Sequence, residues 1–308
     1  MKKVKLLTTI LVVASIALGI IGCSSPSGPD NGGTQEGERF VLIPAGTFQM
    51  GSNKGYYDNK PVHKVTITKP FYMGKYEVTQ AEYEEFCSYR SSSPSPSYGD
   101  GDNYPAYFVS WYHALVYCNK RSKAEGLTPC YSIDGSTDPE EWGEIPYATL
   151  DNPLCDTWDA VKCNWTANGY RLPTEAEWKY AARAGDNTVE SLTYSGTSDV
   201  NKLGEYAWYK DNSNSTTHEV GKKEANAFGL YDMSGNVSEW CWNWYTDSYY
   251  TTTEGVSDPT GASAGSGRVL RGGSWSGDSG YCAVSRRSFS GPVILYGDVG
   301  FRVVRQAN

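Results

Sequence analysis

The sequence predicts an α+β fold that is rich in loops and has small antiparallel sheets. Short runs in which β-branched or aromatic residues alternate with others lie near both ends, as is typical of strands. Helix-capping patterns lie between them, and long connections rich in Gly, Asn and Ser, such as 91–104 and 247–266, separate the elements. No second linker, heptad run or internal repeat interrupts 39–308, which we therefore treat as one domain.

The strands and helices are expected in this order. Residues 40–51 are typical of strand, turn and strand, with Pro44 and Gly46 at the turn, and 63–68 alternate as a further strand. Capping boxes begin one helix at Thr79 and another at Thr174, and a helix between them begins near Ser110. The helix at Thr174 should bury Trp178 and Ala181 and end at Gly185.

Composition excludes some partners. The net charge of −8 and the pI of about 5.0 make nucleic acid and anionic membrane surfaces poor electrostatic partners. Aromatic residues reach 14%, with 24 Tyr and 10 Trp against 8 Phe. This excess of amphipathic rings suits a protein that presents contact surface to partners.

The N-terminus is expected to be a targeting segment. A short basic start precedes an apolar run from Leu6 to Ile21, which is too short for a membrane span. Gly22-Cys23 then resembles a bacterial lipobox, so 1–22 is predicted as a lipoprotein signal peptide and Cys23 as the lipid attachment site. A plain signal peptide with an incidental Cys is the alternative. Residues 23–38 should be a flexible tether that holds the protein to the outer membrane or cell surface of the bacterial envelope.

Two rigid borders enclose an unusual segment near the C-terminus. Residues 268–275 and 300–305 both have strand-like patterns. Between them, 276–299 contains no Lys, Glu, Gln, Met or Trp. These are the five amino acids that the Asn codon AAC cannot give when both of its adenines are randomised. A Gly- and Ser-rich loop is the other explanation for their absence.

The borders and four internal motifs resemble a known family. The borders contribute Arg271-Gly272-Gly273-Ser274-Trp275 and Gly300-Phe301-Arg302. The internal motifs are Met50-Gly51-Ser52, Tyr76-Glu77-Val78-Thr79, Gly169-Tyr170-Arg171-Leu172-Pro173-Thr174-Glu175-Ala176-Glu177-Trp178 and Asn226-Ala227-Phe228-Gly229-Leu230-Tyr231-Asp232-Met233. In this order they resemble the formylglycine-generating-enzyme-like (sulfatase-modifying) domains, a branch of the C-type lectin fold. The resemblance covers 39–308 and implies a lectin-like fold that joins its two ends in one small sheet.

The enclosed segment is similar to the variable regions of diversity-generating retroelements, and the chain resembles the variable lipoproteins of spirochaetes. In such systems an Asn-codon-rich template is copied with adenine-specific errors into the 3′ end of a gene. Arg287 and Pro292 fall where these regions keep an Arg and a Pro. The resemblance implies a variable region at about 268–305.

The family's oxidase chemistry is not expected. Its enzymes hold Cu(I) with two thiolates, and the resemblance places Cys282 at the second position but Gly277 at the first. Cys282 is then interpreted as a small buried apolar residue. Seven cysteines remain after Cys23, Cys282 among them, and their pairing stays open; the three histidines form no metal motif.

A calcium site is implied by one segment, although no cofactor is required. Asp232 and Glu239 would supply carboxylates, and Gly235 and Val237 backbone carbonyls, which are the hard donors that calcium prefers. The alternative is a Gly-Asn turn that leads into an aromatic strand, with both acids solvated.

We therefore predict a surface-displayed, ligand-binding lipoprotein that is not an enzyme and whose partner is an unknown protein or surface ligand. Tyr281, Phe289 and Tyr296 are the expected anchors. The alternatives are an extracytoplasmic enzyme of the same family, a structural envelope lipoprotein, and, for the segment itself, an ordinary hydrophobic loop in the core. The predicted variable, ligand-binding positions are Ser276, Gly277, Asp278, Gly280, Tyr281, Arg286, Ser288, Phe289, Ser290, Gly291, Val293, Ile294, Leu295, Tyr296, Gly297 and Asp298.

Overall fold

The structure is a computed structural model that describes residues 39–307 except 55, 90–91, 148–153, 187–191 and 253–254. The predicted signal peptide, Cys23 and the tether therefore lie outside the described residues. The α-helices are α2 (Gln80–Phe86), α3 (Trp111–Ala124), α4 (Leu154–Asp159), α5 (Glu175–Ala182) and α6 (Leu203–Tyr206). Short 3-10 helices are η1 (Tyr57–Asn59), η2 (Pro139–Glu141), η3 (Val200–Lys202) and η4 (Tyr249–Thr252).

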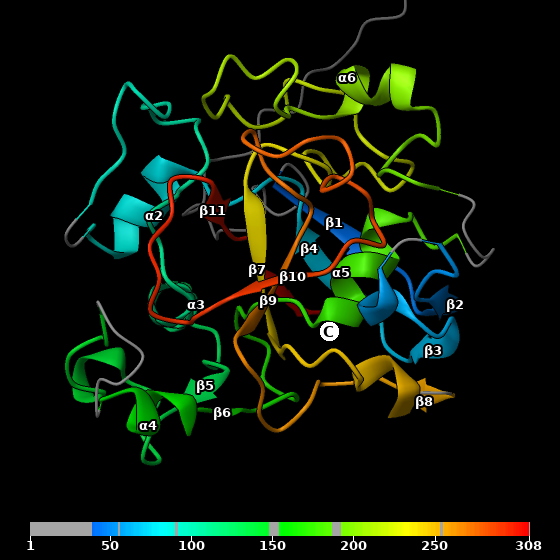
Figure 1. The fold of residues 1–308 in the computed structure, drawn as a ribbon. Coiled ribbons are helices and arrows are strands. Elements are labelled where there is room, and N and C mark those ends of the chain that lie inside the picture. Colours follow the sequence, from blue (N-terminus) through cyan, green and yellow to red (C-terminus); the bar gives the residue numbers. More distant parts are fainter. Residues whose placement is uncertain are drawn as a thin grey trace, which may run out of the picture. The chain divides into compact units, whose positions relative to one another are not determined.

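The strands are short and form four small sheets (Figure 1). They are β1 (Phe40–Ile43), β2 (Gly46–Met50), β3 (His63–Ile67), β4 (Phe71–Gly74), β5 (Tyr131–Ser132), β6 (Lys162–Cys163), β7 (Ser238–Trp244), β8 (Val256–Ser257), β9 (Arg268–Arg271), β10 (Ser288–Ser290), β11 (Val299–Gly300) and β12 (Val304–Gln306). The strands predicted around Pro44 and Gly46 form as β1 and β2, but they join different sheets.

One sheet joins the two ends of the domain. Its order is β1-β4-β12, so the first and the last strands both pair antiparallel with β4. In the register, Met73 of β4 lies opposite Val41 on one side and Val304 on the other. The expectation that the ends meet in one small sheet is confirmed.

A second sheet, β10-β9-β7-β11, carries the C-terminal segment (Figure 1). Strand β9 pairs antiparallel with β7 and places Arg271 opposite Glu239, while β11 pairs parallel with β7 and places Gly300 opposite the same residue. The rear border is therefore not one strand, as predicted, but two. It divides between β11 and β12, which belong to different sheets, because Phe301, Arg302 and Val303 turn inward between them and are buried.

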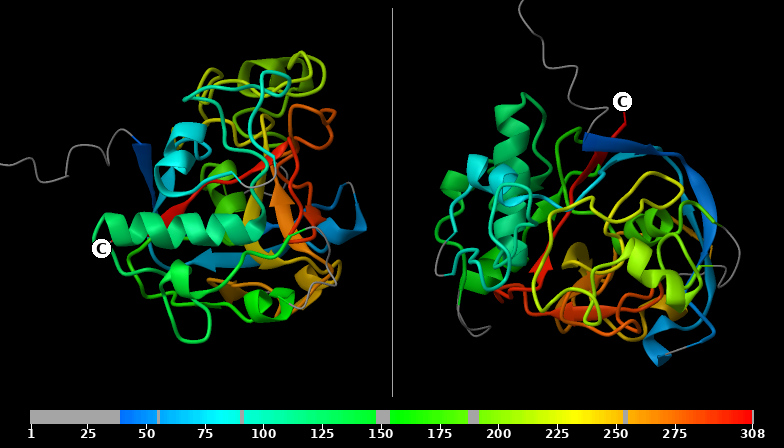
Figure 2. Two further views of the ribbon diagram at one scale, coloured as in Figure 1. Left: turned by 90° about the vertical axis from the view of Figure 1, so that its left-hand side faces the viewer. Right: turned by 90° about the horizontal axis from the view of Figure 1, so that it is seen from above.

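The predicted helices form where their caps lie. Thr79 and Thr174 each make a complete capping box with the Glu three residues later, and the Ser110 hydroxyl caps α3. Figure 2 shows α3, the longest helix among the described elements, in side view. The α5 residues Trp178 and Ala181 are fully buried, as expected.

Two large apolar clusters fill the described part of the molecule. One packs α3 against β7, β11 and the residues around Phe301, and the other packs α5 against β2, β3, β4 and β9. Tryptophan and tyrosine supply much of both, so part of the aromatic excess is core rather than contact surface. Within the described ranges, no helix has the length and apolar character needed to cross a membrane.

Candidate functional site

The C-terminal segment 276–299 begins at a tight backbone turn. Gly272 and Gly273 have φ angles of 94° and 74°, a region that favours glycine. A Cβ atom on Gly273 would lie 2.7 Å from the backbone of Tyr281, so only glycine lets the chain return this closely upon itself. The Gly pair of the front border thus fixes the direction in which the segment leaves β9.

Buried arginines hold the backbone of this segment. Arg271 donates hydrogen bonds to the carbonyl oxygens of Val284, Ser285 and Arg286. The Arg287 guanidinium is fully buried and makes a bidentate ion pair with Glu175, at 2.7 Å and 3.0 Å. Arg287 lies inside the segment but was predicted to be fixed, and its burial explains why. A neutral side chain there would remove the bidentate partner of Glu175 and leave Arg271, at 3.9 Å, as its remaining ion pair.

All the predicted variable positions except Val293 are exposed or half-buried. Tyr281, Phe289 and Tyr296 are 44%, 47% and 47% exposed, although rings of this size usually bury most of their area. Within the segment, the predicted fixed residues Cys282, Val284 and Pro292 are buried. The three rings expected to contact a ligand are therefore exposed, and these three fixed residues are not.

A cavity of about 590 Å³ opens at this surface. It contains all three exposed rings, and several serines line it with them. Among the described residues of its lining, Asp298 is the only charged one. The Oδ2 atom of Asp298 accepts hydrogen bonds from the Ser274 and Ser276 hydroxyls at 3.0 Å and 2.7 Å. The predicted variable residues in the lining are Ser276, Gly277, Tyr281, Ser288, Phe289, Ser290, Tyr296 and Asp298.

The other predicted positions lie away from the cavity lining. Val293 is 2% exposed and packs in the apolar core, so its prediction as a ligand contact does not fit the structure, and Ile294 packs partly against the same core. Arg286 stacks over the ring of Tyr56, 3.7 Å from its centroid. Asp278 and Gly280 are exposed, and Gly291, Leu295 and Gly297 are half-buried. The hydrophobic-loop interpretation thus applies to Val293 and its neighbour but not to most of the segment.

Cys282 has no disulfide partner among the described residues and lies in a small apolar cluster. Its side chain is fully buried against Tyr194, Leu203 and Ala207. Burial, with the nearby Asp278 carboxylate, raises the pKa of the Cys282 thiol to about 12. A thiol that remains protonated at neutral pH is a poor nucleophile and a poor metal ligand. All seven cysteines of the described residues are free thiols.

Glu239, one of the predicted calcium ligands, binds an arginine instead. The Glu239 carboxylate accepts hydrogen bonds from the Arg302 guanidinium on both oxygens, each at 2.7 Å, and from the Trp178 indole at 2.7 Å. Asp232 Oδ2 accepts from the Gly221 amide, while its Oδ1 has no hydrogen-bond partner among the described residues. In this arrangement the set does not fit a calcium site, because Arg302 occupies both Glu239 oxygens. Calcium binding stays a prediction.

The alternative interpretation of this segment is right about the turn and wrong about the acids. Asp232, Gly235 and Asn236 all have positive φ angles, and strand β7 follows them directly. Asp232 and Glu239 are not solvated, however: they are 2% and 0% exposed. Burial raises the pKa of Asp232 to about 6, and the Gly221 amide only partly offsets this shift.

The sequence did not single out Glu77, which joins this buried group. Its carboxylate accepts hydrogen bonds from Asn236 Nδ2 at 2.7 Å and from the Val237 amide at 3.0 Å. Burial, with Asp232 and Glu239 nearby, raises the pKa of Glu77 well above its usual range. Glu77 and Asn236 are 159 positions apart in the sequence, and the only local signal was a Glu in the Tyr76–Thr79 motif.

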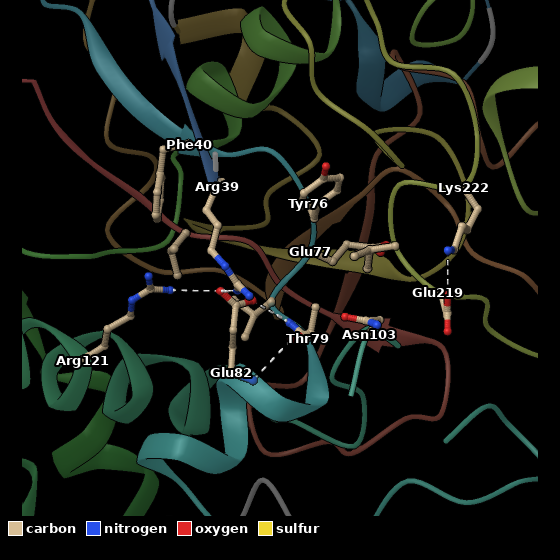
Figure 3. A pocket seen from close by; sticks show the side chains of 14 residues that line it. Arg39, Phe40, Tyr76, Glu77, Thr79, Glu82, Asn103, Arg121, Glu219 and Lys222 are labelled. Atoms are coloured by element: carbon tan, nitrogen blue, oxygen red, sulfur yellow. Dashed lines mark hydrogen bonds and ion pairs between the residues drawn. The ribbon is translucent and has the colours of Figure 1, made fainter. Parts of the chain in front are cut away.

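A second cavity, of about 310 Å³, lies at the start of the domain (Figure 3). Arg39 and Arg121 both pair with Glu82, and Lys222 pairs with Glu219 at 2.8 Å (Figure 3). These residues form ion pairs within the lining, which also includes the Glu77 carboxylate. The aromatic cavity differs from this one, because the described residues in its lining include one acid, Asp298, and no cation.

The fold and this surface define a lectin-like scaffold that presents a C-terminal segment. The whole domain matches the family model of the sulfatase-modifying factor enzyme 1-like domain over residues 28–307. The chain belongs to this family, and the predicted fold class is confirmed.

Individual relatives include proteins of several kinds. Chaperone protein LppX of Paenibacillus barcinonensis is 36% identical over 313 residues, which cover 96% of this chain and 97% of that protein. The formylglycine-generating enzyme of Streptomyces coelicolor is 28% identical over 292 residues, 87% of this chain and 89% of that protein. The solved structure of Treponema denticola variable protein 1 has a TM-score of 0.75 and 36% identity, and the match covers 87% of this chain and 95% of that one. The predicted resemblance to spirochaete variable proteins is confirmed.

Proposed function

We propose that this protein is a variable, ligand-binding surface protein that binds its partner at the aromatic cavity. The observation that carries the proposal is the cavity of about 590 Å³ whose lining holds Tyr281, Phe289 and Tyr296. Aromatic side chains bury large areas at small entropic cost and dominate many contact surfaces. Exposed rings grouped in one concavity would be a liability for a protein without a partner.

The lining also limits the chemistry of the partner. Serine hydroxyls can donate or accept hydrogen bonds, and Asp298 contributes the only charge. A neutral or cationic group of a protein or surface ligand suits this lining, and an anionic group would meet the Asp298 carboxylate. The net charge of −8 likewise disfavours nucleic acid.

We further propose that the segment is diversified by a retroelement. Arg271 and Arg287 hold its backbone through carbonyl oxygens and a buried ion pair, neither of which depends on the exposed side chains. Substitutions at exposed positions away from such features usually change stability by only about 0.5 kcal/mol. The restricted amino acid vocabulary of 276–299 and the similarity to a protein named as variable support the same proposal.

The family includes enzymes, but we propose that this chain is not one. Its oxidases need two thiolates, and here Gly277 lies at the first position while the second, Cys282, is buried and protonated. Purified protein should not convert the cysteine of a sulfatase-type peptide to formylglycine when Cu(I) is supplied. Formation of that product by the wild-type chain would overturn this part of the proposal.

Display at the bacterial envelope through Cys23 belongs to the same proposal. The Cys23→Ala variant should move from the membrane fraction to the soluble fraction, because it can no longer receive lipid. A conservative change in the tether, Ser24→Ala, should leave the protein in the membrane fraction. If the Cys23→Ala variant stays with the membrane, the lipid anchor is wrong.

Two experiments test the variable function directly. A near-identical repeat beside the gene, differing from the 276–299 coding region at adenines, would identify the template. Independently, codons that randomise adenines can be placed at Tyr281, Ser288, Phe289, Ser290 and Tyr296, with the same change at Val284, Arg287, Pro292, Val299 and Phe301 as the control library. Most members of the first library should fold and most of the second should not. Equal folding failure in both libraries would show that the segment is core.

A further inference from the structure

A third cavity lies apart from the proposed ligand surface and shares no lining residue with it. Its volume is about 180 Å³, roughly that of six water molecules in the liquid. It is bounded by Gly51 and Ser52 after β2, by α5 and the residue that follows it, and by Val284 and Ser285 of the C-terminal segment. This volume suits an ion of a few heavy atoms rather than a nucleotide or a peptide.

Every charged residue in the lining of this cavity is cationic. These residues are Lys54, Lys179 and Arg183, and no carboxylate of the described residues lines it. Side chains that carry hydroxyl groups, Ser52, Thr193 and Ser285, form part of the wall. The charge of this lining is thus opposite in sign to that of the aromatic cavity, whose one charged residue among those described is the acid Asp298.

Lys179 is the deepest of the three cations. It is 1% exposed, and its Nζ atom donates to the Gly51 carbonyl oxygen at 2.8 Å. An ammonium group has three donors, and this is the one hydrogen bond that the described residues give it. The acid on the preceding turn of the helix, Glu175, is already held by the bidentate pair with Arg287.

The surroundings oppose a positive charge on Lys179. Burial, then Arg271 and Arg183 nearby, hold the pKa of the Lys179 ammonium well below its usual range. Arg183 itself is 2% exposed; it donates to the Gln49 carbonyl oxygen at 2.7 Å, and Asp186 lies close enough to favour its charge. The one hydrogen bond of Lys179 among the described residues goes to a neutral carbonyl oxygen, so an anion within this cavity would favour the charged form of Lys179.

We propose that this cavity is a binding site for a small tetrahedral oxyanion, phosphate or sulfate, held by the Lys179 ammonium and the Arg183 guanidinium. Oxyanions of this kind offer several acceptor oxygens, which match the remaining Lys179 donors and the hydroxyl groups of the wall. The site is formed by the fixed part of the chain, because Val284 and Ser285 are not among the predicted variable positions. It would therefore be present in every sequence variant, whatever ligand the aromatic cavity binds.

Binding can be measured on the purified full chain by calorimetry and by thermal unfolding. Sodium phosphate and sodium sulfate should each bind saturably and raise the Tm, whereas sodium chloride at the same ionic strength should not. The Lys179→Met variant should weaken phosphate binding at least tenfold. The matched Lys120→Met variant, whose ammonium pairs with Glu140 at the surface, should bind phosphate like the wild type.

A second variant covers the case in which Lys179→Met does not fold. Ser285→Asp places a carboxylate in the wall of the cavity, so it should raise the Tm without added phosphate and remove the response to phosphate. The proposal is overturned if phosphate and sulfate raise the Tm no more than chloride does, if acetate binds more tightly than either, or if Ser285→Asp keeps the full phosphate response. None of these results bears on the aromatic cavity, so the proposed function is tested separately.

Discussion

The aromatic cavity and the buried framework beneath it use opposite chemistry within one short stretch of chain. At the cavity, Tyr281, Phe289 and Tyr296 expose nearly half of their area. Beneath it, Arg271 and Arg287 are fully buried and bind carbonyl oxygens and Glu175. The difference shows how one segment can separate the groups that contact a partner from the groups that fix its shape. Changes in one set should leave the other largely intact.

The largest expected effect comes from breaking the framework. Arg287→Met leaves Glu175 buried without its bidentate partner, which should lower the free energy of unfolding by about 3–5 kcal/mol. Urea denaturation measures this loss. The double variant Glu175→Met with Arg287→Met should recover part of it, since both members of the bidentate pair are removed together, and the loss that remains would report the contact of Arg271 with Glu175. A loss below about 1 kcal/mol for the single variant would mean that the framework does not depend on this pair.

The complementary change removes the contact groups. Replacing Tyr281, Phe289 and Tyr296 together by Ser should weaken binding of a ligand recovered by selection at least thirtyfold, since each hot-spot ring contributes about 2 kcal/mol or more. The Tm should change little, because the rings are half exposed, although Phe289 stacks on Tyr245 with centroids 4.2 Å apart. Phe301→Ser in the rear border should do the reverse and damage folding first. If the triple variant unfolds, the cavity is part of the core.

A third change tests the buried acids beside β7. The pKa of Asp232 is raised to about 6, so the folded protein binds more protons than the unfolded chain between about pH 4 and pH 6. Stability contributed by protonated Asp232 is therefore present at low pH and lost as the pH rises through 6. Asp232→Asn should stabilise the protein at pH 7 by about 1–3 kcal/mol, and this gain should shrink toward pH 4. The exposed control Asp211→Asn should show no such pH dependence.

The smallest effect is expected from calcium. With both Glu239 oxygens bound by Arg302, adding calcium or a chelator should shift the Tm by less than about 2 °C, which corresponds to under 1 kcal/mol in a domain of this size. A saturable rise above that value would show that Arg302 releases Glu239 to the ion. The predicted ligand set of Asp232, Gly235, Val237 and Glu239 would then be right.

Local patterns predicted most of the elements. The capping boxes at Thr79 and Thr174 and the alternation around β3 depend on residues three or two positions apart, so a single sequence reveals them. The exposed rings of the segment 276–299 could also be predicted from the sequence. The border motifs and the absence of five amino acids between them can both be recognised in one short stretch of chain. Val293 was misplaced since an apolar residue in a loop gives no sign of which way it points.

The pairs that join distant parts of the chain could not be predicted in this way. Glu239 binds Arg302, which is 63 positions away, and Glu77 binds Asn236 at a still larger separation. No spacing rule connects such residues, and the family resemblance instead assigned Glu239 to a metal. The division of the rear border into two strands has the same origin, because Phe301 and Arg302 find partners only in the folded chain.

Arg271 and Gly300 both pair with Glu239, and this has a consequence for the length of the segment between them. Both residues flank Glu239 of β7, one on each side, so the intervening chain is a loop whose ends are closed by a strand outside it. The entropy of closing a flexible loop grows slowly, by about 0.6 kcal/mol for each doubling of its length. Insertions at the exposed tips should then cost little, as long as both ends keep their register on β7. With both ends of the loop held on β7, the protein could change the depth and reach of its contact surface by inserting residues as well as by substituting them.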